Sequence, residues 1–193
     1  MNQFKENVIL VDADYIDHVA FDLTVNFERM IGRQIPKADL AHWIDCVALD
    51  GGLRPKEGQQ TQVVIIHPKQ KKVLDNFVPS SLADEINGKA FSDNLGEFVF
   101  ETHTDEDIAD ADRVFTESLE LVCVQPEVKR VIVVPGDSKY NNVRETLRHI
   151  DDPDKHITVL TMQPAAGGPF RQELLGYSMM AALGIRSEEL STI

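Results

Sequence analysis

The sequence lacks most features of secreted proteins, of membrane-spanning proteins and of proteins that bind a metal through cysteine. It has only two cysteines, Cys46 and Cys123, and no cysteine pair at a spacing typical of a metal site. Each falls on the apolar face of an expected helix, which predicts two buried thiols in a reducing compartment. No segment approaches the ~18 consecutive apolar residues of a transmembrane helix. The polar start, residues 1–7, does not resemble a signal peptide. We therefore expect a cytoplasmic protein without a membrane partner.

Positive charge is also scarce. The chain has 19 Lys and Arg residues against 32 Asp and Glu residues, and a formal net charge of −13. Nucleic-acid backbones are bound by clustered Lys and Arg, so this composition argues against passive attraction to RNA or DNA. It does not exclude a nuclease, because bound divalent cations would offset the acids of a site. Glycine-rich phosphate loops are missing too, and the six histidines show no ligand spacing.

The apolar residues are distributed as short strands that alternate with amphipathic helices. The chain has 193 residues, of which 42% are hydrophobic, which fits one domain with its own core. The expected strands are residues 8–11, 63–66, 96–102, 129–134 and 157–160. This alternation predicts an α/β fold, a three-layer α/β/α sandwich with a mostly parallel sheet of about five strands. We expect the order 3-2-1-4-5. The single domain spans residues 1–193, with a C-terminal helix and tail over residues 170–193.

Two of the expected strands lead directly into acidic residues. Residues 8–11 are four apolar residues, three of them β-branched, and Asp12 and Asp14 follow them. Residues 131–134 lead in the same way, through a Pro-Gly pair, to Asp137. In the expected strand order these strands are neighbours at the switch point, so Asp12 and Asp137 should face one crevice. Asp14 also stands where a helix N-cap is expected.

A third group of acids lies between residues 101 and 112, where no Lys or Arg interrupts the acidic residues. A helical apolar pattern runs through it, so we expect Asp107 at a helix start and Asp112 in the same helix. Clustered carboxylates remain ionised when Mg²⁺ or Mn²⁺ neutralises them, and such a metal can orient water for phosphoryl transfer. The same acids also have purely structural interpretations, as an N-cap, a first-turn acid and a turn residue.

These elements resemble the NYN/PIN-like ribonuclease superfamily. In that group strand one ends in an Asp, a second acid begins the helix after strand three, and strand four ends in a Ser-Gly-Asp-Ser-Asp-Phe pattern. The matching segments are Val11-Asp12-Ala13-Asp14-Tyr15, Asp105-Glu106-Asp107-Ile108-Ala109 and Pro135-Gly136-Asp137-Ser138-Lys139-Tyr140. The similarity spans roughly residues 7–161. It implies a Rossmann-like fold and a Mg²⁺- or Mn²⁺-dependent ribonuclease ancestry, with RNA as the substrate. Asp12, Asp107 and Asp137 would be the catalytic, metal-binding acids, and Asp14 and Asp112 would lie around them.

Two departures from the family pattern leave the activity open. Tyr15 stands where the family has Asn, and Lys139 replaces the second Asp of the strand-four motif. An ammonium at that place would pair with Asp12 or Asp137 and hold the crevice together without a metal. One hypothesis is therefore a weak or degenerate metal-dependent ribonuclease. The other is a non-catalytic binding or assembly module of the same fold, acting through a protein partner or as a homo-oligomer.

A second resemblance is to the haloacid dehalogenase pattern. There Asp12 would be the nucleophile and Asp14 the general acid of a Mg²⁺-dependent phosphatase. Strand two ends in His67-Pro68, where that family has Ser or Thr, and the usual flap after strand one is missing. These two differences make the phosphatase the less favoured hypothesis.

Overall fold

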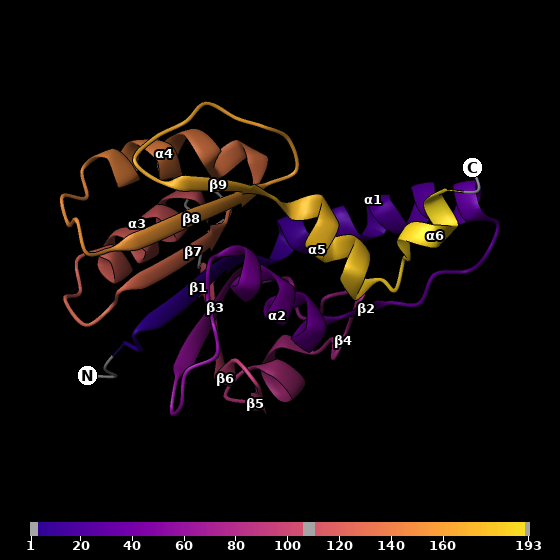
Figure 1. Cartoon of the computed structure of the whole chain (residues 1–193), viewed down its shortest axis with the longest axis horizontal. Helices are drawn as coiled ribbons and strands as arrows, with labels where there is room; N and C mark the ends of the chain where they lie inside the picture. Colours follow the sequence, from indigo (N-terminus) through magenta and orange to yellow (C-terminus); the bar gives the residue numbers. More distant parts are fainter. Residues whose placement is uncertain (1–3, 106–110, 192–193) are drawn as a thin grey trace.

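A central, mostly parallel β-sheet organises the chain. The computed structural model describes residues 4–105 and 111–191. Within them, seven strands form one sheet in the order β5-β6-β3-β1-β7-β8-β9 (Figure 1). The five strands expected from the sequence are β1 (Asn7–Asp12), β3 (Gln60–Pro68), β6 (Gly96–Asp105), β7 (Arg130–Val134) and β8 (His156–Thr161). These five strands run parallel to one another.

The sheet is wider than the expected five strands because both edges carry a further strand. β5 (Ala90–Asp93) pairs antiparallel with β6, and β9 (Arg171–Leu174) pairs parallel with β8. Both are short, and most of their residues are exposed or half-buried. Edge strands of this kind carry no run of apolar residues, so hydrophobic patterning does not detect them.

The C-terminal segment differs most from expectation. In place of the expected helix and tail over residues 170–193, the chain forms β9, then α5 (Leu175–Ala182), then α6 (Ser187–Leu190). Phe170 and Leu174 have a helix-like spacing, but residues 171–174 extend the sheet instead. Pairing with β8 satisfies backbone groups that the outer edge of β8 would otherwise leave open.

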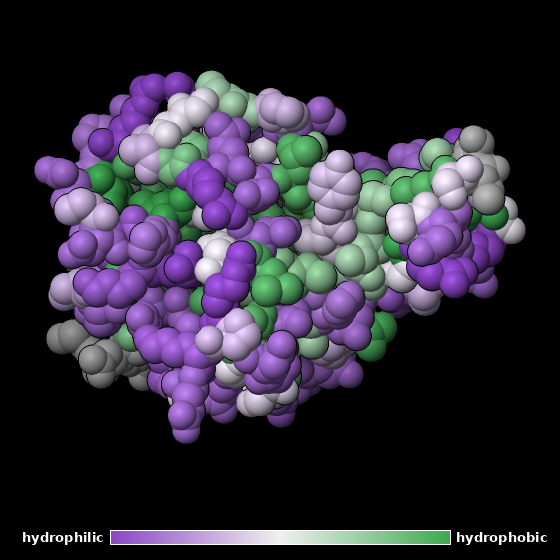
Figure 2. Space-filling view, in the orientation of Figure 1, coloured by the Kyte–Doolittle hydropathy of each residue, from purple (hydrophilic) through white to green (hydrophobic). Residues whose placement is uncertain are grey.

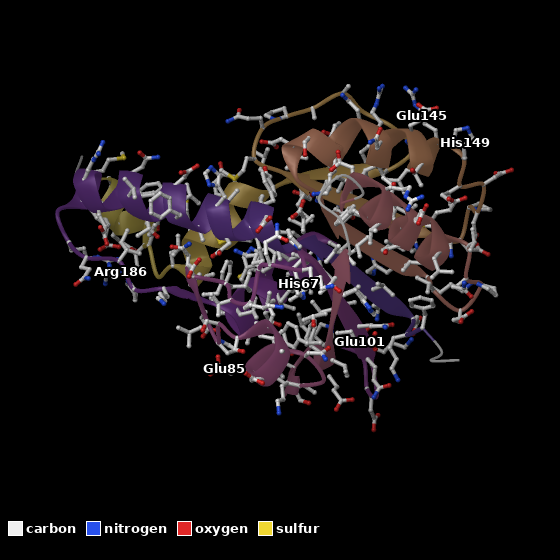
Figure 3. The ribbon with its side chains drawn as sticks, turned by 180° about the vertical axis from the view of Figure 1, so that it is seen from behind. His67, Glu85, Glu101, Glu145, His149 and Arg186 are labelled. Carbon is white, nitrogen blue, oxygen red and sulfur yellow. The ribbon has the colours of Figure 1, made fainter. Side chains whose placement is uncertain are left out.

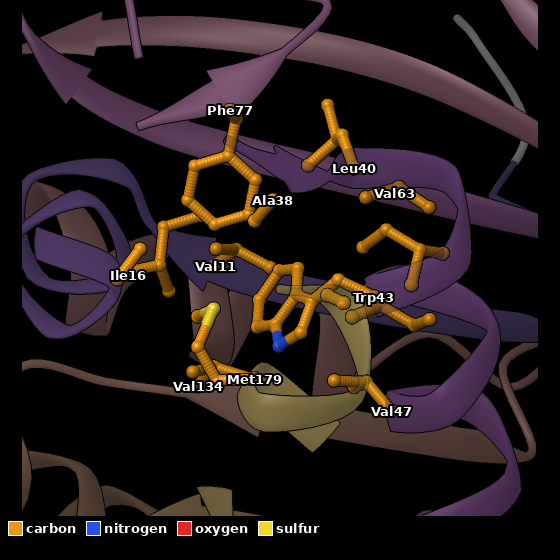
Figure 4. Close-up of a cluster of buried hydrophobic side chains, with 14 of the residues drawn as sticks. Val11, Ile16, Ala38, Leu40, Trp43, Val47, Val63, Phe77, Val134 and Met179 are labelled. Atoms are coloured by element: carbon orange, nitrogen blue, oxygen red, sulfur yellow. The ribbon is translucent and has the colours of Figure 1, made fainter. Parts of the chain in front are cut away.

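Helices cover both faces of the sheet, as the α/β/α expectation requires. α1 (Ala13–Ile31), α2 (Leu40–Asp50) and α5 cover one face, while α3 (Ala111–Cys123) and α4 (Tyr140–Arg148) cover the other. Alternate residues of β1 serve the two layers: Ile9 and Val11 join the first core, and Val8 and Leu10 the second. Trp43 of α2 is fully buried near Phe77 and Met179 at the centre of the first core (Figure 4).

Two helix starts lie elsewhere than the sequence predicts. The N-cap of α1 is Asp12, so the helix begins at Ala13, and Asp14 is an exposed first-turn residue. Proline is common in the first turn of a helix, so Pro36 predicts a helix start, but α2 begins at Leu40 with Asp39 as its N-cap. In both places an Asp side chain accepts a hydrogen bond from the backbone N–H three residues later.

Several short elements complete the fold. β2 (Ala38–Asp39) and β4 (Phe77–Val78) form a separate two-stranded sheet, one turn of π-helix spans Leu82–Ile86, and a 3₁₀ turn spans Asp137–Lys139. Glycine commonly follows the last residue of a helix, and Gly32 and Gly51 are the C-caps of α1 and α2. The distal part of α1 projects beyond the sheet together with α6 (Figure 1). No helix in the described part of the chain is both long enough and apolar enough to cross a membrane.

Candidate functional site

The carboxyl edge of the sheet, where the parallel strands end, brings Asp12 into contact with the turn after β7. Asp12 is the last residue of β1 and only 5% exposed. One carboxylate oxygen, Oδ1, accepts a hydrogen bond from the backbone N–H of Tyr15 at 3.3 Å and thereby caps α1. The other oxygen, Oδ2, is directed to the β7 side. A buried carboxylate needs a partner there.

That partner is Lys139. Its Nζ lies 2.6 Å from Oδ2 of Asp12, and the two side chains are 13% and 7% exposed. The ammonium also lies 3.7 Å from Oδ1 of Asp112, a half-exposed acid in the first turn of α3. Lys139 thus connects the start of α1 to the start of α3 across the end of β7. Charge-assisted hydrogen bonds of this length are among the stronger ones in proteins.

Tyr15 makes the second cross-link at this edge. Its hydroxyl donates to Oδ1 of Asp137 at 2.9 Å. Burial, followed by the hydrogen bond to Asp137, raises the pKa of Tyr15 above its usual range, so the hydroxyl stays protonated and remains a donor. Tyr15 and Lys139 are the two residues that depart from the NYN/PIN-like pattern. They are also the residues whose side chains donate hydrogen bonds to Asp137 and Asp12.

Gly136 permits the close approach of these segments. A Cβ atom built on Gly136 would lie 2.8 Å from Oδ2 of Asp12 and 3.6 Å from Cβ of Tyr15. A larger residue would therefore displace the carboxylate that Lys139 contacts. The Pro-Gly pair before Asp137 is explained by this packing as well as by the turn itself.

The predicted site residues are brought together only in part. Asp12, Asp137, Lys139 and Asp112 gather at the end of β1 and β7, where the sequence placed them. Asp14 faces away toward Lys71, with 3.5 Å between Nζ and Oδ1. Asp107 lies outside the described residues, so its place at this edge stays a prediction.

A second lysine–carboxylate pair lies beside the first and was not predicted. Asp17 of α1 is 4% exposed and accepts from Nζ of Lys71 at 2.7 Å and from the backbone N–H groups of Asp75 and Asn76. Burial raises the pKa of Asp17, but the hydrogen bonds from Lys71 and Asn76 outweigh it, and the net pKa is lowered. The signal in the sequence was an acid on the inner face of α1, next to Ile16 and Ala20.

Lys71 belongs to a short basic stretch, residues 69–72, whose composition is typical of a solvated loop or a strand extension. The side chain of Lys71 is only 15% exposed. Its contact with Asp17 ties the segment after β3 to α1. The pairing raises the pKa of Lys71 despite its burial.

The histidines do not join the acids in a cluster. His67 is buried near the end of β3, and its Nδ1 lies 3.0 Å from the carbonyl oxygen of Pro68. His149 lies on the outer surface at the end of α4, near Glu145 (Figure 3). Within residues 4–105 and 111–191, no group of three His, Cys, Asp or Glu side chains is placed to hold a metal ion.

The carboxylate oxygens at this edge are arranged to bind an internal ammonium rather than a divalent cation. Mg²⁺ and Mn²⁺ require several oxygen ligands around one point. Oδ2 of Asp12 is already in contact with a positive charge, and Oδ1 of Asp137 accepts from a phenol. A cation at this point would have to displace Lys139 or tolerate its charge.

Comparison with known proteins places the chain in a family without assigning an activity. The model of DUF6621, a family of unknown function, matches residues 1–190. The chain belongs to this family. No curated protein and no solved structure matches it.

Proposed function

We propose that this DUF6621 protein is a non-catalytic binding module of NYN/PIN-like type, in which Lys139 takes the place that a metal ion has in the nucleases. The observation that carries this proposal is the 2.6 Å contact between Lys139 and the buried Asp12. The strand order β6-β3-β1-β7-β8 supports the likeness in fold, since it puts the two acid-bearing strand ends side by side.

Charge balance favours this proposal over a working ribonuclease. A two-metal or one-metal site concentrates negative charge so that the cation is held and its water is activated. Here the ammonium neutralises one carboxylate internally, and Tyr15 binds another. The phosphatase alternative has less support, because Asp12 as a nucleophile would need a free oxygen, whereas both of its oxygens accept hydrogen bonds.

Manganese titration of the purified protein by calorimetry tests the proposal. We expect no micromolar binding in the wild type or in Asp12→Asn. The substitution Lys139→Asp introduces the acid that the NYN/PIN-like motif has at this position, and it should create Mn²⁺ binding. Lys69→Asp, at an exposed lysine on the loop after β3, is the matched control and should not. RNA cleavage in the presence of Mn²⁺ is measured on the same four proteins.

The outcomes separate the hypotheses. Micromolar Mn²⁺ binding by the wild type that is lost in Asp12→Asn would refute the proposal and support the metal-dependent ribonuclease. If Lys139→Asp gains no binding, the correspondence to the nuclease motif is itself wrong.

A further inference from the structure

At the amino edge of the sheet, where the parallel strands begin, several cations are grouped around one hollow. A pocket of about 580 Å³ opens there between the loop after α2 and the first residues of β1, β7 and β8. Its charged and titratable lining residues are Glu6, Arg54, Lys56, Lys129, Arg130, Asp154 and His156. A cationic hollow is unexpected in a chain with a net charge of −13.

Three of the four cations form no direct ion pair within the described residues, although the carboxylates of Glu6 and Asp154 also line the pocket. Lys56 pairs with Glu6 at 3.1 Å, so those two charges cancel. Within the described residues, Arg54, Lys129 and Arg130 form no ion pair with a carboxylate. Lys129 is exposed, whereas Arg130 is half-buried at the start of β7.

The two arginines are held in place through only part of their guanidinium groups. Nη1 of Arg130 donates to the carbonyl oxygen of Gly51 at 2.8 Å, and Nη1 of Arg54 donates to the carbonyl oxygen of Leu53 at 2.7 Å. These carbonyls follow the C-terminal end of α2, where guanidinium groups are favoured. In the described part of the chain, Nε and Nη2 of both side chains make no hydrogen bond, so a second ligand can use them.

The backbone is shaped to admit this arrangement. Gly52 has φ +87°, and a Cβ atom there would lie 2.8 Å from Nη1 of Arg130. Burial, and then the neighbouring charges of Arg171 and Arg54, lower the pKa of Arg130, and the nearby charge of Glu6 opposes this shift. Grouping like charges without a partner costs free energy that a bound anion would return.

We propose that this pocket binds the polyphosphate group of a small molecule, contacted by Arg54, Lys129 and Arg130. Four cations against two carboxylates give the lining a net positive charge, which suits a diphosphate or triphosphate better than a monocarboxylate, and guanidinium groups suit phosphate oxygens. The volume is that of a small-ligand pocket. A long polyanion such as RNA is less suitable, because the surrounding acidic surface would repel it.

Calorimetric titration without divalent cations tests this pocket. The titrants are inorganic pyrophosphate, inorganic tripolyphosphate, ADP, ATP and a single-stranded RNA oligonucleotide, all in EDTA at constant ionic strength. We expect the polyphosphates to bind the wild-type protein in the micromolar range. Tighter binding of ADP and ATP than of the inorganic ions identifies a nucleotide, and equal binding identifies the polyphosphate group alone as the ligand.

Variants locate the binding to the pocket. Lys129→Gln removes an exposed cation without an internal contact and should weaken binding about fivefold. Arg130→Gln should weaken it more than about tenfold. Lys37→Gln, at an exposed lysine outside the pocket, should bind as the wild type does.

Three results would overturn the proposal. The first is no detectable binding of any polyphosphate to the wild type. The second is equal affinity in Lys129→Gln and Lys37→Gln, which would place the binding elsewhere even if Arg130→Gln fails to fold. The third is tighter binding of the RNA oligonucleotide than of every small phosphate, which would make the surface a nucleic-acid contact instead.

Discussion

Charged side chains are arranged in opposite ways at the carboxyl edge and at the amino edge of the sheet, where the parallel strands end and begin. At the carboxyl edge, Lys139 and Lys71 each contact a buried carboxylate at 2.6–2.7 Å. At the amino edge, Arg54, Arg130 and Lys129 stand together without a carboxylate partner in the described residues. Cations that are already neutralised serve the fold, whereas unneutralised cations that the fold holds together indicate a ligand. Figure 2 shows how strongly polar side chains dominate one face of the body.

If the lysine–carboxylate pairs at the carboxyl edge were not needed for stability, the contrast between the two edges would no longer hold. Lys139→Met leaves Asp12 buried without its ammonium, and breaking such a pair costs roughly 3 kcal/mol of unfolding free energy. For a domain of this size the melting temperature should fall by about 9 °C. Urea unfolding followed by fluorescence of Trp43, the single tryptophan, measures the loss.

The double variant Asp12→Asn with Lys139→Met is the control for the first prediction. Asn retains the N-cap of α1 but carries no charge, so part of the lost stability should return. A loss below about 0.5 kcal/mol in Lys139→Met would mean that the pair behaves like a solvated surface pair.

The second pair provides a prediction with a defined pH dependence. Because the folded-state pKa of Asp17 is lowered, its contribution to stability is full above the unfolded pKa and is lost as the pH falls through the lower folded value. Asp17→Asn should therefore cost about 2 kcal/mol at pH 7, and this difference from the wild type should shrink below about pH 4.

Asp14→Asn is the matched control for Asp17. Asp14 also contacts Lys71, but at 3.5 Å and with 57% of its side chain exposed. Its replacement should change stability by less than about 0.5 kcal/mol at every pH. Equal effects of the two variants would show that burial does not distinguish them.

The carboxyl pair of Asp45 and Asp93 should behave in the opposite sense. Burial, and then a hydrogen bond and repulsion from Asp93, raise the pKa of Asp45 to about 6. Its contribution is fully present below the unfolded pKa and is lost as the pH rises through about 6. Asp45→Asn should thus stabilise the protein at pH 8 by about 1 kcal/mol, a value reduced for its partial exposure.

Thermal melts of Asp45→Asn at pH 4.5 and pH 8 check this. The variant should exceed the wild type by about 3 °C at pH 8 and by much less at pH 4.5. An advantage of the same size at both values would contradict the raised pKa, since a pH-independent gain comes from packing alone.

The sequence predicted those parts of the molecule that depend on local patterns. Four apolar residues before Asp12 predict β1, and the Pro-Gly pair before Asp137 predicts the end of β7, because buried parallel strands need such runs. The ends of α1 and α2 follow in the same way from Gly32 and Gly51. Strands that lack apolar runs, such as β9, are defined by pairing with a neighbour, which no local pattern records.

The sequence predicted the position of the site and the pairing of Lys139 with Asp12, one of the two partners expected for it, but not the contacts of Tyr15 and Lys71. Asp12 and Lys139 are 127 residues apart, and only the side-by-side placement of β1 and β7 brings their side chains together. The link between Lys71 and Asp17 spans 54 residues and depends on how the loop after β3 returns to α1. The amino-edge cations were missed because Arg54, Lys129 and Arg130 form no cluster in the sequence.

The smallest expected effect gives the sharpest test of the contrast between the edges. Without ligand, Lys129→Gln removes one of three grouped cations and should leave stability unchanged or raise it by up to about 0.5 kcal/mol. Lys139→Gln makes the same chemical change and should be strongly destabilising, since it removes the partner of Asp12.

Thermal melts of both variants at low salt and with added tripolyphosphate measure the difference. Tripolyphosphate should stabilise the wild type more than Lys129→Gln, because a ligand that binds the folded state stabilises it more when the affinity is higher. If Lys129→Gln is as damaging as Lys139→Gln, the amino-edge cations hold the fold together, and their grouping no longer argues for a ligand.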